Sequence, residues 1–388
     1  MTPWGADSEF DGQALIGRTI LQVAPALDGG ADSLACVETA AALAEAGARA
    51  LVAGAPGPLV SELQARGGVF IPFATATKNP WTAAFNRMKL ERLASREGAD
   101  LIHLRGGAGL AAAAYAAHKA HIPLVAEAVA GAETPEADSV IFFSDAGLEA
   151  ATNAHPERAA HFYRGLRGVD LRAYAPDNID SARVRRLREA WGVKAHVRLI
   201  VTVGLPPERQ KWVLAAAAQL KARGFFANEA QEARLIWRQR EGSDMTPGFF
   251  EDEAKRLGLE GDVLRIACAD RAAACLAAAI VLAPAGDASF AIEAQALGAP
   301  VALLQKETGE SAESICAPPT VEPSGRTGWV IPPGQAQTLA RAIDEACRMA
   351  ASARESLALR ARDHARGFST DRMSALTLAL YARRLAGA

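Results

Sequence analysis

The segment Gly286 to Val301 is the clearest candidate for chemistry, because it follows an apolar run and opens a short helix closed by Gly298. The first N–H groups of a helix have no partner inside the helix, and together with the helix dipole they attract phosphate. Glu293, one turn further on, has a carboxylate that could accept two hydrogen bonds from a ribose diol. The alternative is an ordinary turn in which Asp287 or Ser289 caps the helix and Glu293 lies at the surface.

A second glycine-rich turn, Gly107-Ala-Gly109-Leu-Ala-Ala112, follows an expected strand, and Glu127 ends the next one. This spacing formally satisfies a dinucleotide-binding fingerprint. However, the turn belongs to an interior strand-helix unit in an alanine-rich chain, where a chance match is easy. The sequence therefore predicts no nicotinamide cofactor.

Composition excludes several classes of protein. The 388 residues are 50% hydrophobic and carry 42 Lys and Arg against 44 Asp and Glu, which argues for globular domains and against a nucleic-acid partner. The cysteines are scattered, so neither a metal site nor a disulfide framework is indicated, and a reducing cytoplasm fits best. The first 17 residues lack the features of a signal peptide, and the uncharged runs are too short to span a bilayer.

The elements that must position these residues form two series. Short runs rich in Val, Ile and Leu alternate with alanine-rich segments of helical spacing, which is typical of parallel sheets with crossover helices. The first series predicts strands at 19–25, 48–53, 69–73, 101–105, 124–128 and 140–144. The second predicts strands at 198–203, 234–238, 263–267, 280–283, 301–304 and 329–331.

Between the two series, the periodicity stops around residues 168–178, where turn formers and a proline mark a linker. We therefore expect an extension at 1–17, one doubly wound α/β domain at 18–172 and a second at 173–369, with the last helix, 370–388, packing back on the first domain. Ligands of such folds bind at the carboxyl ends of the strands, so a cleft between the two sheets is the expected binding place.

Taken together, the segments from Arg18 onward resemble the family 4 glycosyltransferases of bacterial envelope and polysaccharide synthesis. The order and spacing of several short pieces carry the resemblance. They are Ile20-Leu-Gln-Val-Ala-Pro with Gly29-Gly30-Ala31-Asp32, Gly57-Pro-Leu-Val-Ser-Glu-Leu, Lys78-Asn-Pro80, Leu101-Ile-His103-Leu-Arg105, Gly168-Val-Asp-Leu, Arg256-Leu-Gly-Leu, Glu293-Ala-Gln-Ala-Leu-Gly-Ala-Pro-Val, Glu313, and Thr327-Gly-Trp-Val-Ile-Pro-Pro-Gly334.

The resemblance implies the GT-B fold, two facing Rossmann-like domains, and a retaining hexosyltransferase that uses a UDP- or GDP-sugar and a glycan or lipid-linked acceptor. It implies no metal and no cofactor. The residues expected to serve catalysis, in place of family residues that this chain lacks, are Asp287, Arg209 and Lys211. Those assigned to the donor are Gly29, Gly30, Gly204, Ser289, Phe290, Glu293 and Glu313, and those on the acceptor side are His103 and Arg105. A lone His at a strand end is also typical of a hydrogen-bonded core residue.

Three positions depart from the family pattern. Ala285 stands where the family has a sugar-side Glu, Leu205 where it has an Arg beside the diphosphate, and Val129 where it has a His. Asp287 could replace the first, and Arg209 or Lys211 the second. The departures leave open a noncatalytic GT-B relative that acts as a scaffold or regulator, and more remotely a nucleotide-sugar epimerase.

Residues 78–92 have an apolar stripe, Trp81, Phe85 and Met88, at helical spacing among basic residues. The preferred interpretation is that the stripe is the core-facing side of a helix. The alternative is a peripheral contact with the inner face of an anionic membrane, near a lipid-linked acceptor.

Overall fold

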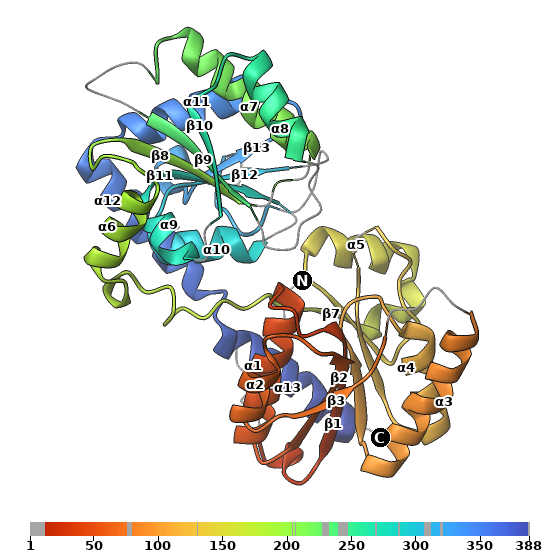
Figure 1. Cartoon of the computed structure of the whole chain (residues 1–388). Helices are drawn as coiled ribbons and strands as arrows, with labels where there is room; N and C mark the ends of the chain where they lie inside the picture. The colour runs from red at the N-terminus through yellow and green to blue at the C-terminus, as the bar shows by residue number, and fades with distance from the viewer. Residues whose placement is uncertain are drawn as a thin grey trace. The chain divides into compact units, whose positions relative to one another are not determined.

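The computed structural model describes residues 12–75, 80–129, 131–203, 205, 207–226, 233–239, 247–267, 270–285, 288–305, 312–318 and 321–386. The chain divides into two compact units (Figure 1). Unit 1 is Met1–Gly168 with Thr370–Ala388, and unit 2 is Val169–Ser369. The first unit is therefore built from two separate stretches of chain, and the second from one.

The sheet of unit 1 is parallel and runs in the order β3-β2-β1-β4-β5-β6-β7. Its strands are β1 (Thr19–Ala26), β2 (Arg49–Ala55), β3 (Val69–Pro72), β4 (Leu101–Leu104), β5 (Leu124–Glu127), β6 (Ser139–Phe142) and β7 (Phe162–Arg164). Every residue of β4, β5 and β6 is buried, as expected for strands covered on both faces. The sequence predicted all of these strands except β7.

The helices of unit 1 cover both faces of this sheet. They are α1 (Ala31–Glu45), α2 (Val60–Ala65), α3 (Pro80–Glu97), α4 (Leu110–Ala120), α5 (Asp145–Ala154) and α13 (Thr370–Ala386), with short 3-10 turns at η1 (Gly12–Leu15) and η2 (Pro156–His161). One core cluster joins α1, α13 and the sheet, and another joins α3, α4 and the opposite face of the sheet.

The last helix of the chain, α13, belongs to the core of unit 1. Its residues Leu378, Leu380 and Tyr381 are buried in the same cluster as Ile20 of β1 and Val37 of α1. In Figure 1 this blue helix lies beside the red helix α1, with which it shares the cluster.

Helix α3 corrects the preferred interpretation of the 78–92 segment. Trp81, Phe85 and Met88 are exposed, so the prediction that this stripe faces the core is wrong. The core face of the helix consists instead of Leu90 and Leu93, with their neighbours Asn86 and Ala94.

The sheet of unit 2 is also parallel, in the order β10-β9-β8-β11-β12-β13. Its strands, all predicted from the sequence, are β8 (Arg198–Val203), β9 (Ala233–Gln239), β10 (Val263–Ala267), β11 (Ala278–Pro284), β12 (Val301–Leu304) and β13 (Trp329–Ile331). The helices are α6 (Ser181–Ala190), α7 (Pro207–Ala222), α8 (Pro247–Arg256), α9 (Arg271–Ala277), α10 (Ala288–Ala296), α11 (Ala336–Arg348) and α12 (Ala351–Arg366), with 3-10 turns η3 (Pro176–Asn178) and η4 (Pro323–Gly325).

Candidate functional site

Each sheet has a point where the order of the strands reverses. In unit 1 it lies between β1 and β4, and in unit 2 between β8 and β11. The loops that leave neighbouring strands in opposite directions at such a point open a crevice at the carboxyl end of the sheet, where α/β proteins bind ligands. Most of the predicted site residues follow these four strands.

In unit 2, Glu293 lies on the second turn of α10 and is buried. Its Oε2 atom is 2.8 Å from Nη2 of Arg271, the first residue of α9. The guanidinium of Arg271 also lies over the ring of Phe290, 4.9 Å from its centre. No local pattern in the sequence points to Arg271, because its partner Glu293 lies on α10, a helix that starts 17 residues later.

Tyr174 completes this cluster. Burial, and then the negative charge of Glu293, raise the pKa of Tyr174 above its ordinary value, so the phenol stays protonated and donates a hydrogen bond to the carboxylate. The cation of Arg271 and the hydroxyl of Tyr174 thus fix the orientation of Glu293. A ribose bound there would share the carboxylate with these two groups.

The two cations proposed beside the diphosphate, Arg209 and Lys211, lie apart on α7. Arg209 is buried near the start of the helix, whereas Lys211 is exposed. Lys211 lies near Glu253 of α8. The pKa of Glu253 is lowered first by Arg256 and to a smaller extent by the positive charge of Lys211. Residues two apart on a helix point in different directions, so the pair cannot serve one anion together. The geometry favours Arg209, which follows β8 at the switch point.

The departures at Ala285 and Leu205 are buried positions. Ala285 packs in the core cluster that contains Phe290, and Leu205 in the cluster on the other face of the unit 2 sheet, where its carbonyl oxygen accepts a hydrogen bond from Gln210 Nε2 at 2.8 Å. Val129, the third departure, is exposed.

Glu313 lies in the loop after β12 and is half-buried. Its carbonyl oxygen accepts from Nε2 of His364, 3.2 Å away on α12, and the next residue, Ser314, accepts from Gln295 of α10. The loop is therefore attached to α10, the helix that carries Glu293. Ser289 is half-buried in the first turn of that helix. Asp287 and Gly204 lie outside the described residues.

In unit 1, the turn after β1 begins with Asp28, whose carboxylate accepts hydrogen bonds from Gly30 N at 2.9 Å and Ser33 Oγ at 3.1 Å. Gly29 has φ +87°, a conformation that strains other residues, and open space lies beside its Cα. Gly30 is the N-cap of α1 and supplies no side-chain hydrogen bond. The N–H groups of Gly29 and Gly30 are already bonded to Ser33 Oγ and to the Asp28 carboxylate, so an anion at this helix start would compete with Asp28.

Arg105, directly after β4, is buried and uses three of its nitrogen atoms in hydrogen bonds. Nη1 donates to Glu127 Oε1 at 2.9 Å, Nε to Gln22 Oε1 at 2.7 Å, and Nη2 to Thr39 Oγ1 at 2.6 Å. The second carboxylate oxygen of Glu127 accepts from Gly106 N at 3.2 Å. Arg105 thus binds three elements together beneath the surface rather than presenting a free cation there.

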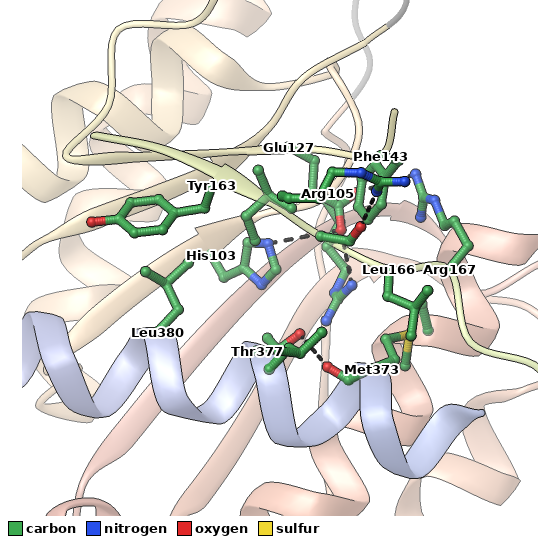
Figure 2. Close-up of a pocket in the computed structure, with 15 residues that line it drawn as sticks. His103, Arg105, Glu127, Phe143, Tyr163, Leu166, Arg167, Met373, Thr377 and Leu380 are labelled. Carbon is green, nitrogen blue, oxygen red and sulfur yellow. Dashed lines mark hydrogen bonds and ion pairs between the residues drawn. The ribbon is translucent and has the colours of Figure 1, made fainter. Parts of the chain in front are cut away.

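His103 is completely buried, with Nδ1 2.5 Å from the hydroxyl of Tyr381 and Nε2 3.8 Å from Glu127 Oε1. Burial and the positive charges of Arg105 and Arg167 hold the pKa of His103 well below 6.5, so the imidazole is neutral. It is the hydrogen-bonded core residue that the sequence allowed as an alternative. Figure 2 shows Met373, Thr377 and Leu380 of α13 facing the strand ends that carry this group.

Arg167 lies above this network. Its guanidinium pairs with Asp32 of α1, lies 3.8 Å from the centre of the Phe143 ring, and has Nη2 3.6 Å from Glu127 Oε2. The sequence analysis missed this residue, and the only local signal was its place just before the linker motif at Gly168. Among the site residues described in unit 1, it is the cation that reaches solvent, with 23% of its side chain exposed.

Within the described ranges, no group of three or more His, Cys, Asp or Glu side chains could hold a metal ion. In the same part of the chain, no helix is both long and apolar enough to cross a membrane.

Two doubly wound α/β units with parallel sheets define the GT-B fold, as predicted. Three solved structures share it. A glycosyltransferase from Rickettsia africae has 18% sequence identity and a TM-score of 0.81, covering 96% of this chain and 100% of its own. HepE from Anabaena, solved with UDP and with UDP-glucose, has 22% identity in the UDP complex and a TM-score of 0.73 over 94% of this chain and 100% of its own.

The third is WaaG, a glycosyltransferase involved in lipopolysaccharide biosynthesis, with 14% identity and a TM-score of 0.66 over 93% of this chain and 99% of its own. No protein-family model matches the chain, and no curated protein matches it in sequence. These likenesses show the fold, and membership of family 4 stays a prediction.

Proposed function

We propose that this chain is a retaining glycosyltransferase that transfers a hexose from a UDP- or GDP-sugar to an envelope glycan or lipid-linked acceptor. The observation that carries the proposal is the likeness of fold over nearly the whole chain to two solved glycosyltransferases and to HepE, which was solved with UDP and with UDP-glucose bound. The cluster of Glu293, Arg271 and Tyr174 at the unit 2 switch point supports it, because it combines a buried carboxylate with a nearby cation.

In this proposal the donor binds at the unit 2 switch point. The first N–H groups of α10, at Ser289 and Phe290, and the cation of Arg209 hold the diphosphate, because charge develops on it as the sugar leaves. Glu293 holds the ribose, and Asp287 takes the sugar-side role of the missing Glu.

Other predicted residues support these groups. Gly204 is assigned to the donor because it follows β8 in the sequence, and Glu313 belongs to the loop attached to α10. In unit 1, Gly29 and Gly30 at the start of α1 are also assigned to the donor, and a phosphate there would take over N–H groups that now bond to Ser33 and Asp28. His103 and Arg105 are positioning residues of the acceptor side, because both are buried and act through Glu127 and Arg167.

Calorimetric titration with UDP, GDP and ADP and their sugars tests donor binding. Glu293→Gln should weaken the affinity for the matched nucleotide by about 1.5 to 3 kcal/mol, or about 10- to 150-fold in Kd, the range for hydrogen bonds to a charged group. The matched control is Glu189→Gln, an exposed Glu on α6. Equal affinity in both variants, with the fold intact by circular dichroism, would remove the ribose role.

A noncatalytic GT-B relative, acting as a scaffold or regulator, is the second candidate. The burial of Ala285 and Leu205 in the packed cores favours it, since neither position holds a group that can face a donor. Nucleotide release from a bound donor separates the two. Turnover with retained anomeric configuration supports the transferase, binding without turnover supports the relative, and inversion at another sugar carbon would indicate an epimerase.

No cofactor enters this proposal. We place the chain in the cytoplasm, at the inner face of the membrane where lipid-linked acceptors are available.

A further inference from the structure

Helix α3 has two opposite faces of different composition. One face carries Asn86, Leu90, Leu93 and Ala94, which are buried against the core of unit 1. Asn86 Nδ2 donates a hydrogen bond to the carbonyl oxygen of Ala74 at 2.7 Å, which fixes the rotation of the helix about its axis. The position of the other face relative to solvent is therefore determined.

The outer face presents large apolar side chains to solvent. Trp81 is 85% exposed, Phe85 61% and Met88 45%. Their spacing of four and three residues places them in one stripe, directly opposite Leu90. Scattered exposed apolar residues are ordinary, but three large ones in a single helical stripe mark an interaction surface.

Basic side chains flank this stripe. The described helix carries Arg87, Lys89, Arg92 and Arg96 against two acidic residues, Glu91 and Glu97. Glu97 is engaged with Arg49 at 2.6 Å and with Arg96 at 2.8 Å, away from the stripe at the end of the helix.

A concavity between β3 and α3 continues the surface. Its lining includes the apolar residues Ile71, Phe73 and Phe85 and the cations Lys89 and Arg92. Lys89 Nζ lies 5.5 Å from the centre of the Phe73 ring, so a cation stands at the edge of an apolar floor.

We propose that the outer face of α3 docks on an anionic phospholipid bilayer, with Trp81, Phe85 and Met88 entering the interface and Lys89 and Arg92 contacting headgroup phosphates. An apolar stripe bordered by cations is the composition of helices that lie in a membrane surface. A second copy of the chain fits poorly, because a symmetric contact of this face would bring Lys89 and Arg92 of both copies together. Docking deepens the proposed location at the membrane by naming the surface that makes the contact, and it does not depend on sugar transfer.

Cosedimentation of the full chain with vesicles tests the surface. The wild type should bind vesicles of phosphatidylcholine with phosphatidylglycerol, and much less those of phosphatidylcholine alone. Each Lys or Arg near an anionic surface contributes about 1 kcal/mol, so Lys89→Gln with Arg92→Gln should lower binding about 25-fold. Phe85→Ser with Met88→Ser should lower it about tenfold or more, because apolar burial is lost.

The matched controls lie in unit 2. Leu359→Ser removes an exposed apolar side chain of α12, and Arg366→Gln removes an exposed cation of the same helix. Both should bind vesicles as the wild type does. The proposal is overturned if the α3 variants bind as the controls do, if phosphatidylglycerol makes no difference, or if the wild type self-associates without lipid and the α3 variants do not. Donor binding is measured separately, so failure of either idea leaves the other standing.

Discussion

Replacing Glu127 by Gln tests whether the buried network of unit 1 holds the sheet and its helices together. The carboxylate is buried and accepts hydrogen bonds from Arg105 Nη1 at 2.9 Å and Gly106 N at 3.2 Å. A Gln side chain of the same shape can accept only one of these, and its amide group then faces a donor. The guanidinium of Arg105 would also remain buried without its compensating charge.

The magnitude follows from burial. Removing one partner of a buried ion pair costs about 3 to 5 kcal/mol, whereas Arg167, which is partly in solvent, adds little after screening. The remaining bonds of Arg105 to Gln22 and Thr39 hold its position, so we expect the lower end, about 3 kcal/mol. That corresponds to a roughly 150-fold larger equilibrium constant for opening of the region.

Native-state hydrogen exchange followed by mass spectrometry resolves the two units. Peptides from β4 and β5 should exchange roughly 150-fold faster in Glu127→Gln, while those from β8 and β11 should be unchanged. The control is Asp145→Asn, which removes the exposed partner of Arg164, 2.8 Å away, and should cost at most about 1 kcal/mol. Equal exchange in the two variants would refute the structural role assigned to Glu127.

Three further predictions concern buried residues, two in unit 1 and one pair in unit 2. The pKa of His103 is lower in the folded protein than in the unfolded chain, so the free energy of unfolding of unit 1 should fall by up to about 1.4 kcal/mol per pH unit below pH 6.5. His103→Gln should flatten this slope. An unchanged slope in the variant would show that another group causes the pH dependence. Tyr381→Phe should lower the free energy of unfolding of unit 1 by about 1 to 3 kcal/mol, because His103 Nδ1 loses its partner. Urea titration monitored by hydrogen exchange measures this loss. An unchanged urea midpoint for unit 1 would contradict the prediction. The double variant Leu205→Arg with Ala285→Glu introduces the residues that the family has at these positions. Because both positions are buried, the added charges should unfold part of unit 2 rather than raise turnover. A stable variant with faster nucleotide release would show that these positions can face the donor.

The alternation of apolar runs and alanine-rich helices was sufficient to predict the fold, because parallel strands buried on both faces leave a continuous apolar signal. The strand β7 was missed since its three residues, Phe162–Arg164, are too short to show a period. The stripe on α3 was misassigned for a different reason: hydrophobic spacing shows that residues share a face, but not which face meets the core. Leu90 and Leu93 form a competing stripe on the same helix, and packing against α4 decides between them.

The candidate residues could be proposed from the sequence where a strand end or a helix start gives a local signal. Arg105 directly follows β4, Gly29 lies just before α1, and Glu293 lies on the second turn of α10. Their partners were not, because Arg271 belongs to another helix and Tyr381 lies 278 residues from His103 along the chain. Such pairs exist only after folding, so no spacing rule relates them.

The return of α13 to the first unit has a consequence for biosynthesis. The segment that buries Val37 and Ile20 leaves the ribosome only after unit 2, a single stretch, has been made. Unit 2 is therefore free to fold first, although it is translated second. Until α13 has been made, the apolar surface of unit 1 that packs against Leu378, Leu380 and Tyr381 stays exposed. A stop codon near residue 370 would thus damage the beginning of the protein rather than its end.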